Sequence, residues 1–174
     1  VETIISIYNA VVKGIPSMER VVTVTGDGVV NPGNYKVLFG TNQNELIEAA
    51  GGLKEGCEKV ISGGPMMGFA MYTTDTPITK TSSSILCMSK DEVSACEPTA
   101  CINCGRCVDA CPSRIIPSRL ADFAERHDEE AFLKFNGLEC VECGSCSYVC
   151  PAKRQLKQAI GSMRKTALAN KKKK

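Results

Sequence analysis

The most restrictive feature of this sequence is a spaced run of four cysteines that occurs twice. The first run comprises Cys101, Cys104, Cys107 and Cys111, and the second comprises Cys140, Cys143, Cys146 and Cys150. Each run reads C-x2-C-x2-C-x3-C and is followed by a proline, and each cysteine of the second run lies 39 residues after its counterpart. Thiolates are soft ligands that bind iron or zinc. The pattern therefore indicates a metal-binding segment.

The spacing is typical of proteins that hold two [4Fe–4S] clusters, in which the fourth cysteine of each run binds the other cluster. Three consecutive cysteines wrap one cube, and the fourth points away from it. We therefore expect cluster I to be bound by Cys101, Cys104, Cys107 and Cys150. We expect cluster II to be bound by Cys140, Cys143, Cys146 and Cys111.

Two other uses of these cysteines are less compatible with the pattern. A zinc site uses two pairs of cysteines, whereas this chain has two runs of four, each with a following proline. A secreted disulfide scaffold conflicts with the odd count of eleven cysteines and with the lack of a signal-peptide pattern. Reduced thiols and cluster assembly point to the cytoplasm.

Three cysteines and the single histidine lie outside the two runs. Cys96, Cys101 and Cys104 together match the start of the plant-type [2Fe–2S] spacing, but position 135, where the repeat would place a partner of Cys96, is Phe135. Cys57 and Cys87 are expected to pack as small apolar side chains, and Cys96 to lie near a cluster without binding it. His127 is expected at the surface, with no ligand role.

Composition excludes several further classes. No apolar run approaches the roughly 18 residues that a membrane-spanning helix needs. Residues 152–174 carry nine Lys or Arg and no Asp or Glu, which suits an acidic partner, anionic lipid, or simply a solvated terminus. Nucleic-acid binding has little support, because aromatic residues make up only 5% of the chain and do not alternate with the basic ones.

The segment before the cysteines alternates between helical and strand patterns. Apolar residues between positions 2 and 13 recur at helical spacing, and a second helix is expected after Thr41 or Asn42. Strands are expected at 20–26, 35–39, 59–62, 69–73 and 83–88. This order predicts a small α+β domain of β-grasp type. The glycine-rich segment 63–68 lacks the pattern of a nucleotide loop, and we expect a tight turn whose methionines pack on a neighbour.

The cysteine-rich segment is expected to be mainly helical. Pro117 suits the first turn of a helix, Asp128 is a good N-cap for the next, and residues 152–169 form a third helical pattern. We expect apolar neighbours of the cysteines to limit water access to the clusters: Ile102, Val108, Val141, Tyr148 and Val149. Acidic residues nearby should lower the cluster potentials: Asp109, Glu139 and Glu142.

The sequence resembles the C-terminal part of the C subunit of Rnf complexes, which are ion-translocating ferredoxin:NAD oxidoreductases. The resemblance is carried by both cysteine runs, by residues 20–26, by residues 31–35 and by the segment Gly63-Gly64-Pro65-Met66-Met67-Gly68. It implies an SLBB domain, which is a β-grasp module, followed by a helical two-cluster ferredoxin domain. The implied domains are a helix at 1–18 left from an upstream flavin and NADH domain, SLBB at 19–88, ferredoxin at 89–170 and a basic tail at 171–174.

The resemblance also implies a function, cofactors and partners. The chain would relay single electrons through two [4Fe–4S] clusters as part of an oxidoreductase, while FMN and NADH would bind only in the missing upstream domain. Its partners would be other Rnf-type subunits, among them a ferredoxin-like iron–sulfur subunit and membrane subunits. The chain itself would span no membrane and would lie at the cytoplasmic face of the cell membrane.

Two alternatives stay open at this point. A cobalamin-reductase-like flavoprotein would share both segments and would bind the clusters through the same residues. A metal-stabilised binding scaffold would use the cysteines only to hold its fold.

Overall fold

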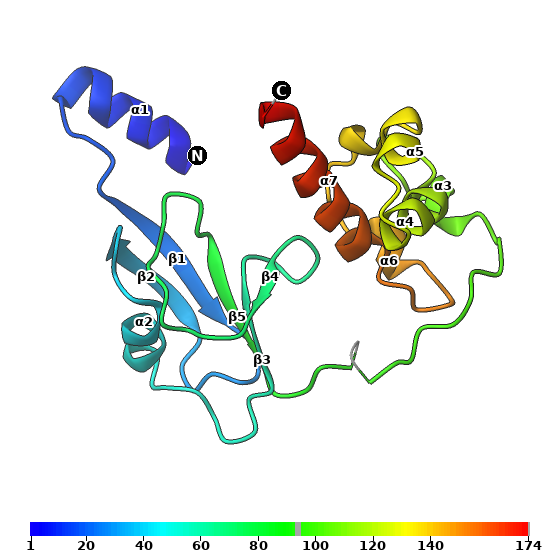
Figure 1. Cartoon of the computed structure of the whole chain (residues 1–174). Helices are drawn as coiled ribbons and strands as arrows, with labels where there is room; N and C mark the ends of the chain where they lie inside the picture. Colours follow the sequence, from blue (N-terminus) through cyan, green and yellow to red (C-terminus); the bar gives the residue numbers. More distant parts are fainter. Residues whose placement is uncertain (93–94, 174) are drawn as a thin grey trace. The chain divides into compact units, whose positions relative to one another are not determined.

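The computed structural model describes residues 1–92 and 95–173, which divide into two units (Figure 1). The N-terminal unit comprises Val1–Asp91, and the C-terminal unit comprises Glu92–Lys174. Each unit has its own cluster of buried apolar side chains. The chain is therefore an α+β protein built from two independently packed bodies, as the sequence predicts.

The N-terminal unit is a five-stranded mixed sheet with the order β2-β1-β5-β3-β4. Its elements are α1 (Glu2–Lys13), β1 (Glu19–Thr25), β2 (Gly33–Leu38), α2 (Gln43–Ala49), β3 (Lys59–Ser62), β4 (Phe69–Met71) and β5 (Ser84–Met88). Strands β1 and β5 run parallel, and the other neighbours are antiparallel. All five predicted strands and both predicted helices are present.

The core of this unit lies between the sheet and α2. Alternate residues of β1, Val22 and Val24, are fully buried and pack in one cluster with Leu46 and Ile47 of α2. Strand alternation places Val22 and Val24 on one face, and helical spacing places the α2 residues opposite them. Asn42 begins α2, since its side chain accepts a hydrogen bond from the Asn44 N–H at 2.9 Å. Of the two alternatives that the sequence offers for this N-cap, Thr41 and Asn42, the structure therefore has Asn42.

Two expectations for this unit need correction or qualification. The helix α1 forms as predicted, but none of its residues is buried. Its N-terminus is held by Glu2, which accepts a hydrogen bond from the Val21 N–H at 2.9 Å and pairs with Arg20 at 3.2 Å. Residues 63–68 form a turn as predicted, but Met66 and Met67 are not buried, since they are 43% and 62% exposed.

The C-terminal unit consists of short helices around the two cysteine runs. They are α3 (Arg106–Asp109), α4 (Pro117–Glu125), α5 (Glu129–Lys134), the 3-10 turn η1 (Gly137–Glu139), α6 (Ser145–Tyr148) and α7 (Leu156–Lys173). Pro117 opens α4 and Asp128 caps α5, as predicted. The basic residues Lys171–Lys173 continue α7, although the sequence predicts a separate tail from position 171 onward. Lys174 lies outside the described residues.

Helices α4 and α7 carry most of the core of this unit. Its fully buried side chains include Leu120 from α4, Phe132 from α5 and Ile160 from α7. Several cysteines pack against the same core: Cys107, Cys111, Cys140, Cys146 and Cys150. The cysteines are thus part of the packing of the unit.

Candidate metal centres

The two cysteine runs adopt the same backbone conformation. Asn103 and Glu142, each of which directly precedes the second cysteine of its run, both have a φ of 55°. Gly105 and Gly144 have φ angles of 78° and 84°, and each precedes a one-turn helix, α3 or α6. Left-handed residues at these places reverse the chain around the cysteines. The 39-residue repeat of the sequence is therefore also a repeat of structure.

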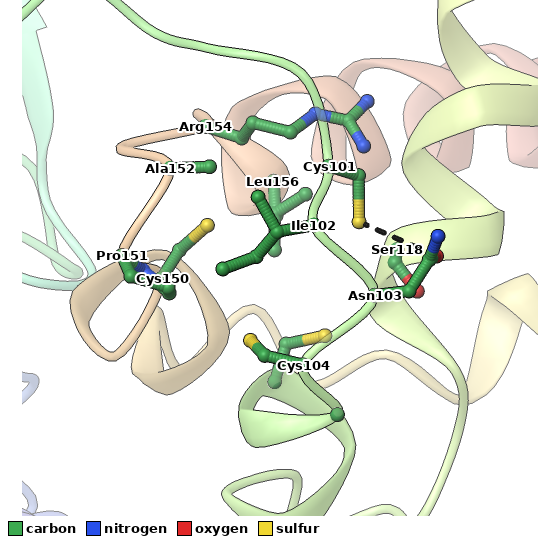
Figure 2. A pocket seen from close by; sticks show the side chains of 12 residues that line it. Cys101, Ile102, Asn103, Cys104, Ser118, Cys150, Pro151, Ala152, Arg154 and Leu156 are labelled. Carbon is green, nitrogen blue, oxygen red and sulfur yellow. Dashed lines mark hydrogen bonds between the residues drawn. The ribbon is translucent and has the colours of Figure 1, made fainter.

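The first pocket collects the three leading cysteines of the first run and the last cysteine of the second. Its cysteines are Cys101, Cys104, Cys107 and Cys150. Figure 2 shows Cys101, Cys104 and Cys150 around the pocket, with the side chain of Ile102 drawn among them. The volume of the pocket is about 110 Å³. Cys101 and Cys104 are exposed, whereas Cys107 and Cys150 are half-buried.

The second pocket has the reciprocal composition. Its cysteines are Cys111, Cys140, Cys143 and Cys146. The pocket is narrower, about 20 Å³, and none of its cysteines is exposed. The structure thus sorts the eight cysteines into the same two groups of four that the spacing predicts as ligand sets.

The thiols of the second pocket differ in their ionisation. Burial raises the pKa of the Cys146 thiol to about 11 and also raises the pKa of Cys140. Hydrogen bonds with the side chain and backbone of Ser145 lower the pKa of Cys143. Binding of a metal requires thiolates and releases their protons. The hydrogen bonds with Ser145 therefore favour the thiolate form of Cys143.

The donor chemistry of both pockets fits iron–sulfur clusters. Four thiols surround each pocket, and the loops supply backbone donors, such as the Glu142 N–H, which donates to the Cys140 sulfur at 3.4 Å. Iron–sulfur clusters are bound by four cysteine thiolates and are tuned by hydrogen bonds to sulfur. Within the described ranges, no cluster of three or more His, Cys, Asp or Glu side chains is suited to a single metal ion.

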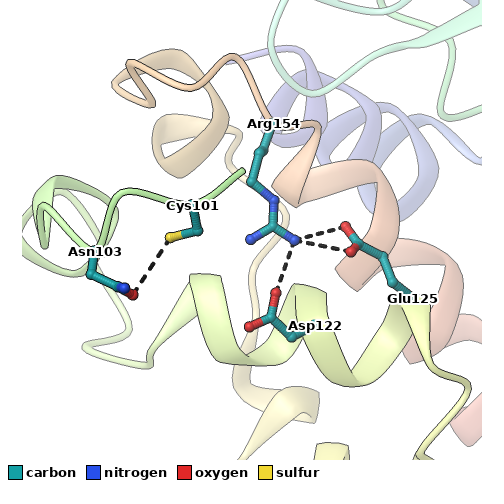
Figure 3. Close-up of polar contacts among 5 residues, drawn as sticks. All are labelled: Cys101, Asn103, Asp122, Glu125 and Arg154. Carbon is teal, nitrogen blue, oxygen red and sulfur yellow. Dashed lines mark hydrogen bonds and ion pairs between the residues drawn. The ribbon is translucent and has the colours of Figure 1, made fainter. Parts of the chain in front are cut away.

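A half-buried arginine that sequence reasoning missed, Arg154, lines the first pocket. Figure 3 shows Arg154 bridging from the start of α7 to α4, where its Nη2 donates to Asp122 and to Glu125, each at 2.9 Å. Burial alone lowers the pKa of Arg154, but the bonds to Asp122 and Glu125 outweigh burial and raise it. A comparison across the 39-residue repeat would have found this residue, because Ile115 occupies the equivalent position.

The remaining cysteines and the histidine line neither of the two pockets. Cys87 is fully buried in the N-terminal core and Cys57 packs beside it, as predicted. Cys96 is exposed and its thiol donates to the Glu92 carbonyl at 3.4 Å, so its expected place near a cluster is not supported. His127 is exposed at the junction of α4 and α5.

The expected apolar shield around the cysteines is only partly formed. Ile102 lines the first pocket and Val141 the second, although they are 65% and 57% exposed, whereas Tyr148 is 80% exposed and lines neither pocket. Val108 and Val149 are half-buried. The expectation is therefore wrong for Tyr148, whereas Ile102 and Val141 lie where they were expected, on loops that run along the surface.

Known proteins resemble this chain in both units. The SLBB domain family matches residues 21–70, and the 4Fe-4S dicluster domain family matches residues 100–154. The chain is 48% identical, over 92% of its length, to the C subunit of the proton-translocating ferredoxin:NAD(+) oxidoreductase complex of Clostridium ljungdahlii. It is 39% identical, over 99% of its length, to the C subunit of the Na(+)-translocating ferredoxin:NAD(+) oxidoreductase complex of Acetobacterium woodii.

These relatives are much longer than the chain. The aligned region spans 35% of the Clostridium ljungdahlii protein and 39% of the Acetobacterium woodii protein. A third relative, the C subunit of the ion-translocating oxidoreductase complex of Yersinia enterocolitica, is 41% identical over 75% of this chain and 19% of its own length. No helix in the described part of the chain is long and apolar enough to cross a bilayer.

Proposed function

Because this chain belongs to the family of C subunits of ion-translocating ferredoxin:NAD oxidoreductase complexes, we propose that it relays single electrons through two [4Fe–4S] clusters in a complex of that kind. The observation that carries the proposal is the reciprocal grouping of the cysteines. Each pocket combines three cysteines of one run with the fourth of the other. Such cross-connection fixes the separation of two clusters.

The proposed ligands follow the two pockets. Cluster I is bound by Cys101, Cys104, Cys107 and Cys150. Cluster II is bound by Cys111, Cys140, Cys143 and Cys146. The zinc, disulfide and plant-type alternatives find no support in this grouping, since the last cysteine of each run lines the pocket of the other run.

In this function the chain holds and tunes the clusters and makes or breaks no bond of a substrate. When bound, each cluster accepts and releases one electron. The surrounding loops supply N–H donors, as from Glu142 to the Cys140 sulfur, and such donors favour the reduced cluster. The exposed thiols of Cys101 and Cys104 make the first pocket the one that an electron donor or acceptor reaches.

The wider role of the chain follows from its relatives. In a longer protein of this kind, FMN and NADH bind outside the segment that this chain represents. The partners are the other subunits of an Rnf-type complex, including an iron–sulfur subunit and membrane subunits. The chain then lies at the cytoplasmic face of the membrane and contributes to electron transfer that drives ion transport. The names of the relatives favour this role over a cobalamin reductase.

The domain boundaries are part of the proposal. Residues 19–88 form the SLBB domain and residues 89–170 the ferredoxin domain, with the basic segment after them. Helix α1 exposes a set of apolar side chains that suits a cover from an upstream flavin and NADH domain. They are Ile4, Ile5, Ile7, Tyr8, Val11 and Val12. The much greater length of the relatives supports such a domain.

Anaerobic reconstitution of the chain tests the proposal. We expect roughly eight iron atoms per chain and a broad visible absorption that bleaches with dithionite. Cys107→Ser should lose iron, whereas the control Cys96→Ser should retain all of it, because Cys96 lies outside both pockets. A colourless protein that binds zinc instead would contradict the proposal.

A further inference from the structure

The two pockets are lined by equivalent positions of the repeat. Besides the cysteines, Ile102 corresponds to Val141, Asn103 to Glu142, Ser118 to Lys157, Ala152 to Ser113, Arg154 to Ile115 and Leu156 to Pro117. The left-handed residues also occur in equivalent pairs. The backbone therefore follows a similar path around both pockets. A difference in electrostatics between the pockets comes from side chains.

Three of these pairs differ in charge. The first pocket has Arg154 where the second has the buried Ile115. The second pocket has Glu142 and Lys157 where the first has the uncharged Asn103 and Ser118. The first lining therefore carries one positive charge, whereas the two charges of the second lining oppose each other.

Each pocket is lined by one member of an ion pair, which is the cation in the first pocket and the anion in the second. Arg154 lines the first pocket, and its carboxylate partners, Asp122 and Glu125, lie on α4. Glu142 lines the second pocket, and its partner Arg164 lies on α7, with 3.1 Å between Nη1 and Oε1. Arg164 and Glu125 are 39 residues apart, so the same structural position holds a cation in one half and an anion in the other.

The charged residue that lines each pocket decides whether the ion pair raises or lowers the reduction potential of the cluster there. The side chain of Arg154 is 11% exposed, whereas those of Asp122 and Glu125 are 36% and 56% exposed. Solvent screens the more exposed carboxylates, and the charge closest to the thiols acts most strongly. Figure 3 shows one terminal nitrogen of Arg154 bonded to both carboxylates and the other terminal nitrogen on the side of Cys101.

We propose that Arg154 raises the reduction potential of the cluster in the first pocket and Glu142 lowers that of the cluster in the second, so that the first cluster is the higher-potential one. This inference rests on the proposed electron relay, and it adds which of the two clusters is reduced first. An electron shared between the two clusters resides mainly at the exposed pocket. The charged pairs act as tuning residues and touch no substrate.

A redox titration of the reconstituted chain, followed by electron paramagnetic resonance, tests the inference. Arg154→Gln should lower the higher of the two potentials, with about a tenfold change in the reduction equilibrium, which is about 59 mV for one electron. Arg154→Lys retains the positive charge, so its higher potential should stay close to that of the unaltered chain. Glu142→Gln should raise the lower potential, so both charge-removing variants narrow the gap.

A second variant, which adds a positive charge to the first pocket, tests the inference even if Arg154→Gln does not assemble its cluster. Ser118 is half-buried in the first pocket at the position of Lys157 in the second. Ser118→Lys leaves Arg154 and its partners intact and should raise the higher potential.

Two kinds of failure are distinguishable. If two clusters form but Arg154→Gln and Ser118→Lys leave both potentials unchanged, or shift the lower one, the inference on tuning is wrong and the relay stands. If Arg154→Lys shifts the potential as far as Arg154→Gln, the effect is structural and the inference is also wrong. If the unaltered chain binds no pair of clusters, the proposed function itself fails and the inference fails with it.

Discussion

At the scale of single residues, Gly26 has no space for a side chain, because it packs directly against the backbone of Cys87. A Cβ on this residue would lie 1.8 Å from the carbonyl oxygen of Cys87, and its φ is 115°. We expect Gly26→Ala to destabilise the N-terminal unit by about 3 kcal/mol, because clash and backbone strain add. Hydrogen exchange of the β1 and β5 amides measures the loss.

The matched control for this substitution is Gly64→Ala. A Cβ added to Gly64 would meet no neighbouring atom within 4 Å, and its φ lies outside the left-handed region. We expect a change within about 0.5 kcal/mol. Equal effects of the two substitutions would contradict the close packing of Gly26 on Cys87.

Asp27 makes the N-terminal unit sensitive to acid. Its carboxylate accepts hydrogen bonds from the side chain and the backbone N–H of Ser89, and these bonds lower its pKa below the ordinary 3.8. The folded pKa is the lower one, so the stabilisation is present above the unfolded pKa and is lost as the pH falls through the folded value.

The variant Asp27→Asn tests this titration. It removes the charge, so its stability should depend less on pH below about pH 4 than that of the unaltered chain. Acid unfolding followed by circular dichroism measures both slopes. Parallel curves for the two proteins would show that Asp27 does not contribute.

Some residue roles could be predicted from the sequence and others could not. The eight cysteines were predictable as two groups, because fixed spacing leaves a short chain few ways to surround a cluster. The repeat marks the position of Arg154, but its role was not predictable, because that role depends on Asp122 and Glu125, about 30 residues away. The exposure of Ile102 and Tyr148 was missed for a similar reason, since burial depends on packing that spacing does not describe.

At the scale of elements, Asp128 governs the start of α5. Its side chain accepts a hydrogen bond from the Ala131 N–H at 2.9 Å. Asp128→Ala should cost about 1 kcal/mol, which lowers the hydrogen-exchange protection of α5 about fivefold. Asp128→Asn retains an acceptor and serves as the control. Unchanged protection in Asp128→Ala would mean that packing of Phe132 alone holds the helix.

Most elements were predictable because local signals agree with the final packing. Pro117, Asp128 and Asn42 mark helix starts, and the β-branched run 20–25 forms β1. Element ends were harder to predict. The strand expected at 69–73 ends at Met71, and α7 begins at Leu156, four residues after the predicted start. Tertiary contacts decide such ends, and they leave little trace in local sequence.

At the scale of the whole molecule, we expect only one of the two units to depend on iron. Half-buried cysteines pack against the core of the C-terminal unit, whereas the core of the N-terminal unit contains none of the proposed ligands. Removal of iron by a chelator should therefore increase hydrogen exchange in α4 and α7 and leave β1 and β5 unchanged. An equal increase in both units would contradict this division.

The order of the strands illustrates what the sequence could not supply at this scale. Five strands were predictable, but the placement of β5 between β1 and β3 depends on contacts between residues about 60 positions apart. The β-grasp type was predictable from element order and from the resemblance. The reciprocal grouping of cysteines was predictable too, since the repeat constrains both halves at once.

The connection between the two cysteine runs is tested most directly by spectra of cysteine variants. Cys150→Ala, Cys104→Ala and Cys143→Ala should each lose one cluster, and electron paramagnetic resonance of the reduced proteins identifies the one that remains. We predict that Cys150→Ala and Cys104→Ala retain the same cluster and that Cys143→Ala retains the other. If Cys150→Ala instead matches Cys143→Ala, each run binds its own cluster and the proposed cross-connection is wrong.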